Sequence, residues 1–171
     1  MHRTRRRWLT LCSVSLSLVV LVPHPASAVH AAREHESRID YAERPVREFL
    51  KLHFAGSRKF SPTGLDKKKR FLTRRFRQGL YKFFDRIAES KTSLPMVMDP
   101  FTGSQGATTF QVGDAKVRAE KAWVPVSFSD GANDWTITYL VRNDQERNDD
   151  DWLIDDIQDV RGMLLSEVLK R

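Results

Sequence analysis

Residues 134–142 read DWTITYLVR, with large apolar side chains at every second position: Trp135, Ile137, Tyr139 and Val141. A two-residue period places them on one face of a β-strand, and aromatic and β-branched residues favour that conformation. We therefore expect a strand with one face on the core.

Neighbouring segments extend this pattern into a sheet. Similar runs predict three more strands, over residues 108–112, 116–129 and 152–160. In the second of these the apolar phase changes near Lys121, which predicts a bulge or sharp bend. Asp130–Asn133 reads DGAN and is typical of a turn.

Two helical patterns precede the strands. Over Glu43–Ala55 the side chains of Val46, Phe49, Leu50 and His53 share one face, and Gly56 suits the end of the helix. A second helix is predicted to begin at Thr63-x-x-Asp66, which resembles a capping box. Its apolar stripe is Leu65, Leu72, Phe76, Leu80, Phe83 and Ile87, with one wider gap.

The order of these elements defines the expected fold class. Two helices, a long loop over residues 90–106, about four strands and a short closing helix over 161–169 predict an α+β fold. We expect the helices to pack on a strongly bent antiparallel sheet.

The N-terminus has the pattern of an export signal. Four arginines precede an apolar stretch, and Ala26-Ser27-Ala28 matches a cleavage site. We therefore expect a signal peptide over 1–28, a flexible segment over 29–41 and a single domain over 42–171. The expected location is periplasmic or secreted. The one cysteine, Cys12, lies in the signal, so the mature chain can form no disulfide.

Charge is distributed unevenly along the chain. The formal net charge is +7, but removing residues 1–28 leaves 25 basic and 22 acidic residues, so nucleic acid is not the expected partner. A basic face is predicted on the second helix, and an acidic connection over 143–151. The basic face comprises Lys67, Lys68, Lys69, Arg70, Arg74, Arg75 and Arg77.

Two segments carry a family resemblance. Residues 99–106, DPFTGSQG, and the paired stretches DWTITYLVRND and DDWLIDDI within 134–157 resemble a family of exported bacterial proteins of unknown function. The resemblance implies a cone-shaped α+β fold like that of nuclear transport factor two, in which a bent sheet encloses a pocket. This sequence has Gly106 where the family has an acid after Gln105.

Few residues form a pattern typical of catalysis. Asp156 and His53 are the catalytic candidates, as a general base and an acid–base partner in such a pocket. Candidate pocket or partner-binding residues are Asp99, Phe101, Gln105, Trp123, Trp135, Tyr139, Trp152 and Asp155. No cofactor or metal is expected, because no metal-ligand or nucleotide motif is present.

These observations favour an exported, non-enzymatic module that binds a small ligand or a protein partner. One alternative is a small isomerase, dehydratase or hydrolase that uses an Asp–His pair. Another is a binder of anionic surfaces through the basic face. A homodimer formed through the sheet is compatible with this fold class.

Overall fold

The computed structural model describes residues 25–56, 58, 60–90, 98–144 and 151–170. Most of the predicted signal (1–24), part of the long loop (91–97) and part of the acidic connection (145–150) lie outside these residues. Within the described part of the chain, no helix combines the length and apolar character needed to cross a membrane.

One antiparallel sheet organises the fold. Its strands are β1 (Thr109–Val112), β2 (Lys116–Arg118), β3 (Lys121–Ser129), β4 (Asp134–Asn143) and β5 (Trp152–Gln158). β3 pairs with β4, and β4 pairs with β5, while β1 and β2 both pair with the other edge of β3. The predicted α+β class with an antiparallel sheet is confirmed.

The predicted long strand over 116–129 is instead a hairpin. β2 and β3 pair antiparallel, with Arg118 opposite Lys121, so Ala119 and Glu120 form a two-residue turn. Ala119 has a φ of 50°, in the left-handed region that tight hairpin turns require. The change of apolar phase near Lys121 therefore marks a reversal of the chain.

The first helix is longer than the sequence predicted. α1 spans Pro25–Ala55, so residues 29–41, predicted to be flexible, are helical. This segment is rich in alanine, arginine and glutamate, which have high helix propensity. Pro45, expected in the first turn, lies within α1. The helix is held there by four buried side chains, Ala42, Val46, Phe49 and Leu50.

The predicted second helix is divided into three pieces: α2 (Pro62–Asp66), the 3₁₀ turn η1 (Lys69–Phe71) and α3 (Arg74–Ser90). The Ser61 hydroxyl caps α2 by accepting from the Gly64 N–H, so Thr63 is not the cap. The chain is extended at Leu72, which forms a parallel bridge to Ile154, and the Thr73 N–H donates to the Ile154 carbonyl. Pairing with β5 therefore interrupts the helix.

The chain closes with a short helix, α4 (Leu165–Val168), in place of the one predicted over 161–169. Asp159 explains the later start, since its carboxylate accepts from the N–H groups of Arg161 and Met163 and holds a turn there. The register of β4 and β5 shifts between Leu140 and Val141, where Asp155 is left without a partner in the ladder.

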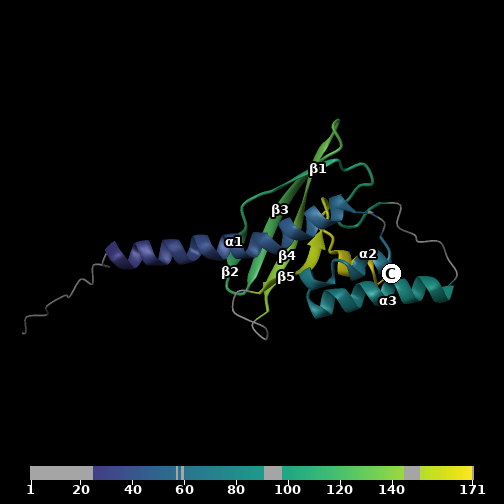
Figure 1. The fold of residues 1–171 in the computed structure, drawn as a ribbon, viewed down its shortest axis with the longest axis horizontal. Helices are drawn as coiled ribbons and strands as arrows, with labels where there is room; N and C mark the ends of the chain where they lie inside the picture. The colour runs from purple at the N-terminus through teal and green to yellow at the C-terminus, as the bar shows by residue number, and fades with distance from the viewer. Residues whose placement is uncertain (1–24, 57, 59, 91–97, 145–150, 171) are drawn as a thin grey trace, which may run out of the picture.

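The core lies between α1 and the sheet. α1 crosses the strands and extends beyond them at its N-terminal end (Figure 1). α3 contacts β5 and α4. The alternating residues Ala122, Val124, Val126 and Phe128 of β3 are buried, as are Ile137, Tyr139 and Val141 of β4. The sequence-predicted inward face of both strands is therefore confirmed.

Candidate functional site

Three ionisable side chains meet inside the core. The His53 ring lies between Asp99 and Lys68: Nε2 is 2.6 Å from Asp99 Oδ2, and Nδ1 is 2.7 Å from Lys68 Nζ. His53 is 0% exposed, Asp99 2% and Lys68 3%. We call these three residues the buried triad.

The hydrogen-bonding capacity of these groups assigns the ring proton of His53 for the state in which Lys68 is an ammonium. A lysine ammonium can only donate, so His53 Nδ1 accepts from Lys68. The ring proton is then on Nε2, which donates to the Asp99 carboxylate. The His53 ring thus links Lys68 to Asp99 through its two nitrogens.

Aromatic rings enclose the triad. The Lys68 ammonium lies 5.3 Å from the centroid of the Phe101 ring and 5.8 Å from that of Phe49. Burial lowers the pKa of Lys68, and the negative charge of Asp99 opposes that shift. Burial also raises the pKa of Tyr139 well above its usual value, and the nearby Asp99 charge adds to this.

A tight turn positions Asp99. Asp99 Oδ1 accepts from the Phe101 N–H, and the Asp99 carbonyl accepts from the Gly103 N–H. Gly103 has a φ of +73°, a backbone conformation that favours glycine. The Tyr139 hydroxyl donates to the Phe101 carbonyl at 2.5 Å, and Trp135 Nε1 donates to the Thr102 carbonyl at 2.7 Å. β4 therefore holds this turn against the sheet.

Two cavities lie at opposite ends of the triad. One of about 410 Å³ lies between the end of α1 and α2, and Lys67 and Lys68 are among its lining residues. Another of about 120 Å³ has Asp99 in its lining, together with apolar residues such as Met98, Ile137 and Leu165. His53 lines neither, and both its ring nitrogens already have partners.

The proposed pairing of His53 with Asp156 is not observed. Asp156 is buried, but its Oδ1 accepts from the N–H groups of Ile157 and Ser166, and its Oδ2 accepts from the Ser166 hydroxyl at 2.5 Å. Asp156 thus ties β5 to the start of α4. The histidine takes Asp99, an aspartate that the sequence placed among the pocket residues.

Replacing Asp156 with alanine is expected to destabilise the protein by about 1.5–3 kcal/mol, the usual cost of losing hydrogen bonds to a charged group. The Ser166 and Ile157 N–H groups would lose their acceptor. Urea unfolding of the purified protein measures this change. Asp114, which is exposed, supplies the matched control, and Asp114→Ala should shift stability by less than about 0.5 kcal/mol. An equal effect of the two substitutions would contradict this role for Asp156.

Asp155 forms a separate link near the protein surface. Its Oδ1 accepts from the Thr73 hydroxyl at 2.7 Å, and its Oδ2 accepts from Arg75 Nη2 at 2.7 Å. Burial would raise the Asp155 pKa, but the Arg75 and Thr73 hydrogen bonds outweigh it and lower that pKa. The carboxylate therefore holds the beginning of α3 against β5.

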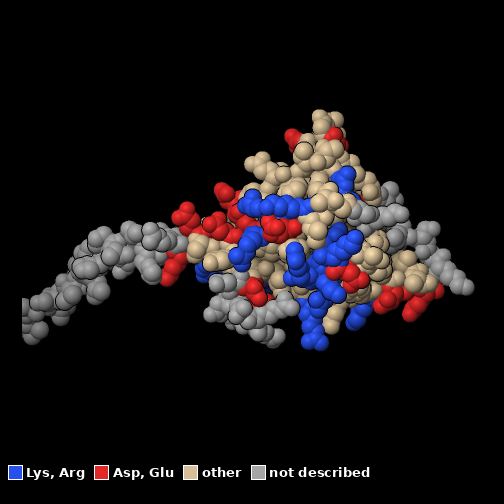
Figure 2. Space-filling model, in the orientation of Figure 1, with Lys and Arg blue, Asp and Glu red and all other residues tan. Residues whose placement is uncertain are grey.

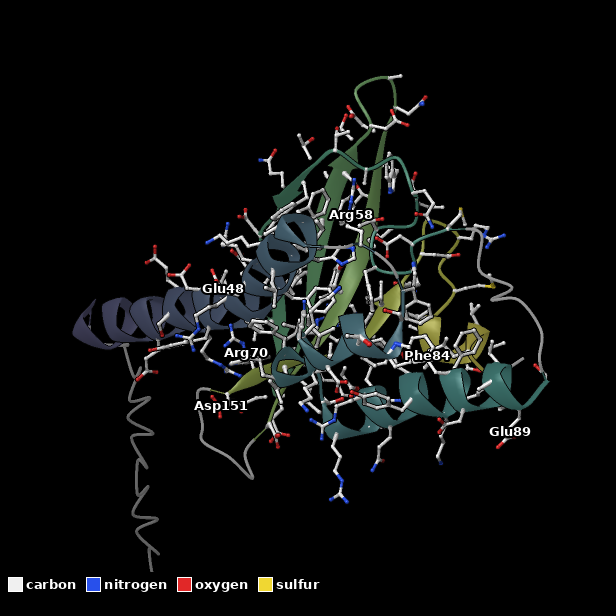
Figure 3. The ribbon with its side chains drawn as sticks, turned by 45° about the vertical axis from the view of Figure 1, so that its right-hand side comes forward. Glu48, Arg58, Arg70, Phe84, Glu89 and Asp151 are labelled. Carbon is white, nitrogen blue, oxygen red and sulfur yellow. The ribbon has the colours of Figure 1, made fainter. Side chains whose placement is uncertain are left out.

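The other predicted pocket residues do not line one shared pocket. Phe101 and Tyr139 are buried core residues, Gln105 is exposed, and Trp123 and Trp135 are half-buried. Trp152 is mostly buried and lines a surface groove of about 230 Å³ with Glu48, Arg70 and Asp151. These three charged residues are labelled in Figure 3, and Arg70 lies between the other two along the groove. Phe101 and Tyr139 therefore serve the core, and a partner-binding role for the other candidates stays a prediction.

The predicted basic face also requires correction. Lys68 is a member of the buried triad, and Arg75 pairs with Asp155. Lys67, Lys69, Arg70 and Arg74 are exposed as predicted, and Arg77 is half-buried.

The buried position of Lys68 was not predicted, although its spacing from the neighbouring leucines indicates it. Lys68 stands three residues after Leu65 and four before Leu72, so it fills the gap in the predicted apolar stripe. A lysine at an apolar position needs a buried partner. His53 on the apolar face of α1 was the available partner.

Comparison with known proteins found no matching protein-family model and no matching curated protein. Among solved structures, the chain is similar to one chain of the type VI effector–immunity complex Tae3–Tai3 from Ralstonia pickettii. The two chains are 18% identical with a TM-score of 0.50, and the match covers 69% of this chain and 95% of the other. This is a likeness of fold.

Proposed function

We propose that the protein is an exported, non-enzymatic binding module whose partner is another protein. The observation that carries the proposal is the likeness in fold to a chain from an effector–immunity complex, which extends over 95% of that chain. That chain comes from an assembly of two proteins, and the same kind of role is assigned here. The resemblance to an exported bacterial family and the signal pattern over 1–28 support the location.

The buried triad supports binding over catalysis. A general base must reach the proton that it abstracts. His53 has no exposed surface, and Asp99 and Lys68 already engage its two ring nitrogens. Such an arrangement links α1, the segment after α2 and the 99–103 turn. Segments linked in this way suit recognition of a partner with little change of backbone shape.

The test is capture followed by reconstitution. The tagged full-length protein is produced in its source cells, cross-linked, purified and analysed by mass spectrometry. A captured candidate is then purified separately and mixed with the protein, and the mass of the complex is measured by light scattering during gel filtration. The proposal predicts a stable complex of defined stoichiometry. A protein that stays alone but carries a small molecule in native mass spectrometry would instead favour a small-molecule binding function.

A further inference from the structure

Cations between the end of α2 and the first turns of α3 gather on one surface, where four are exposed and Arg77 is half-buried. This cationic surface comprises Lys67, Lys69, Arg70, Arg74 and Arg77. Figure 2 shows blue side chains gathered where α2, η1 and the first turns of α3 lie, with red ones at the far end of α3. Asp66 links η1 to α3 at this surface, because it pairs with Lys69 at 3.6 Å and accepts from the Tyr81 hydroxyl of α3 at 2.6 Å.

Most of these cations have no anionic partner within the described residues. Asp66 is the one acid inside the surface, and it is engaged by Lys69 and Tyr81. Asp155, the nearest strand carboxylate, is taken by Arg75 and Thr73. Lys67, Arg74 and Arg77 form no ion pair among the groups that the structure describes, whereas Arg70 shares a groove with Glu48 and Asp151 and adds to the lowering of the Glu48 pKa by Lys51.

The charges of α3 oppose the helix dipole. Anions stabilise the N-terminal end of a helix and cations its C-terminal end. The first turn of α3 contains no acid and its last turn no base, whereas Arg74, Arg75 and Arg77 stand near its start and Asp85 and Glu89 near its end. Arg75 stands there to pair with Asp155, but helix stability does not explain why Arg74 and Arg77 stand there. Cations at the N-terminal end of a helix that do not stabilise the protein itself indicate a function such as binding.

From these observations we propose that the cationic surface docks a carboxylate-rich patch on the protein partner, which rests on the proposed function. Three of its five cations are arginines, whose planar guanidinium groups bind carboxylates in a bidentate manner and are enriched in protein interfaces. The surface contains one acid, Asp66, and α3 has Asp85 and Glu89 near its end, so the surroundings are not uniformly positive. Among the described residues the strongly exposed large apolar side chains are Met98 and Val160, which lie outside it. A protein patch fits this mosaic better than an anionic bilayer.

Two triple variants with the same loss of charge test the surface. One carries Lys67→Gln, Arg70→Gln and Arg74→Gln, all exposed. The control carries Lys116→Gln, Arg118→Gln and Lys121→Gln, which are exposed on β2 and β3. The probe is poly-L-glutamate, titrated at low and at high salt. We expect the first variant to bind about tenfold more weakly than the control, and high salt to remove binding by both.

Equal weakening in the two variants would overturn the inference, because net charge alone would then explain binding. Vesicles of phosphatidylglycerol and phosphatidylcholine provide the second arm. Tighter binding to them than to poly-L-glutamate, lost in the first variant, would assign the surface to lipid and also overturn it. With the captured partner, full complex formation by the first variant would reject this surface and leave the proposed function intact. Failure of the wild-type protein to form any complex would reject the function itself.

Discussion

Replacing Asp99 with alanine is expected to lower the free energy of unfolding by about 3–5 kcal/mol, the usual cost of removing one partner from a buried charge pair. The Lys68 ammonium would keep its burial but lose the only carboxylate that the triad supplies. The Phe101 N–H would lose its acceptor as well. Urea unfolding of the purified proteins measures the loss. The comparison requires that wild type and variant have the same slope of unfolding free energy against urea concentration.

Two further variants separate charge from hydrogen bonding. Asp99→Asn keeps an oxygen for the Phe101 N–H and should lose less stability than Asp99→Ala. Adding Lys68→Met to Asp99→Asn removes the uncompensated cation, so the double variant should be more stable than the sum of the single losses predicts. Strictly additive losses would mean that Lys68 and Asp99 do not act together through His53.

Replacing Phe49 with alanine is the second large effect, at about 3–5 kcal/mol. Phe49 is fully buried, and its ring contacts those of Phe71, Phe101 and Tyr139, with centroid distances of 6.3, 5.1 and 6.3 Å. The truncation opens a cavity where α1 meets both the sheet and the 99–103 turn. Phe49→Leu, measured by the same unfolding experiment, should cost clearly less because it retains most of the volume. A loss below about 1 kcal/mol for Phe49→Ala would show that α1 does not anchor this core.

Elements with a strong period could be predicted from the sequence. The alternation from Trp135 to Val141 gave β4, and the spacing of Val46, Phe49 and Leu50 gave the buried face of α1. Errors arose where tertiary contacts override local preference. Leu72 pairs with Ile154 from β5, a contact distant in sequence, and this breaks the predicted second helix.

The site was predicted only in part for the same reason. His53, Asp99, Phe101 and Tyr139 were all candidates, and the structure brings them together. Which aspartate meets the histidine depends on how the turn after residue 98 folds back, and no local pattern encodes that. Lys68 was assigned to the surface because seven cations close together in sequence predicted one exposed face.

Together these contacts separate two parts of the molecule. The buried triad stabilises the interior and leaves the His53 ring without exposed surface, whereas Lys67, Arg74 and Arg77 on the cationic surface have no ion-pair partner among the described residues. The proposed partner would therefore bind over η1 and the first turns of α3.

The most direct test is amide hydrogen exchange of the protein alone and in complex with its purified partner. We predict slower exchange over residues 67–77 in the complex, with exchange at residues 99–103 unchanged. Slower exchange at 99–103 without any change at 67–77 would contradict it, because the partner would then act on the buried triad instead of the cationic surface.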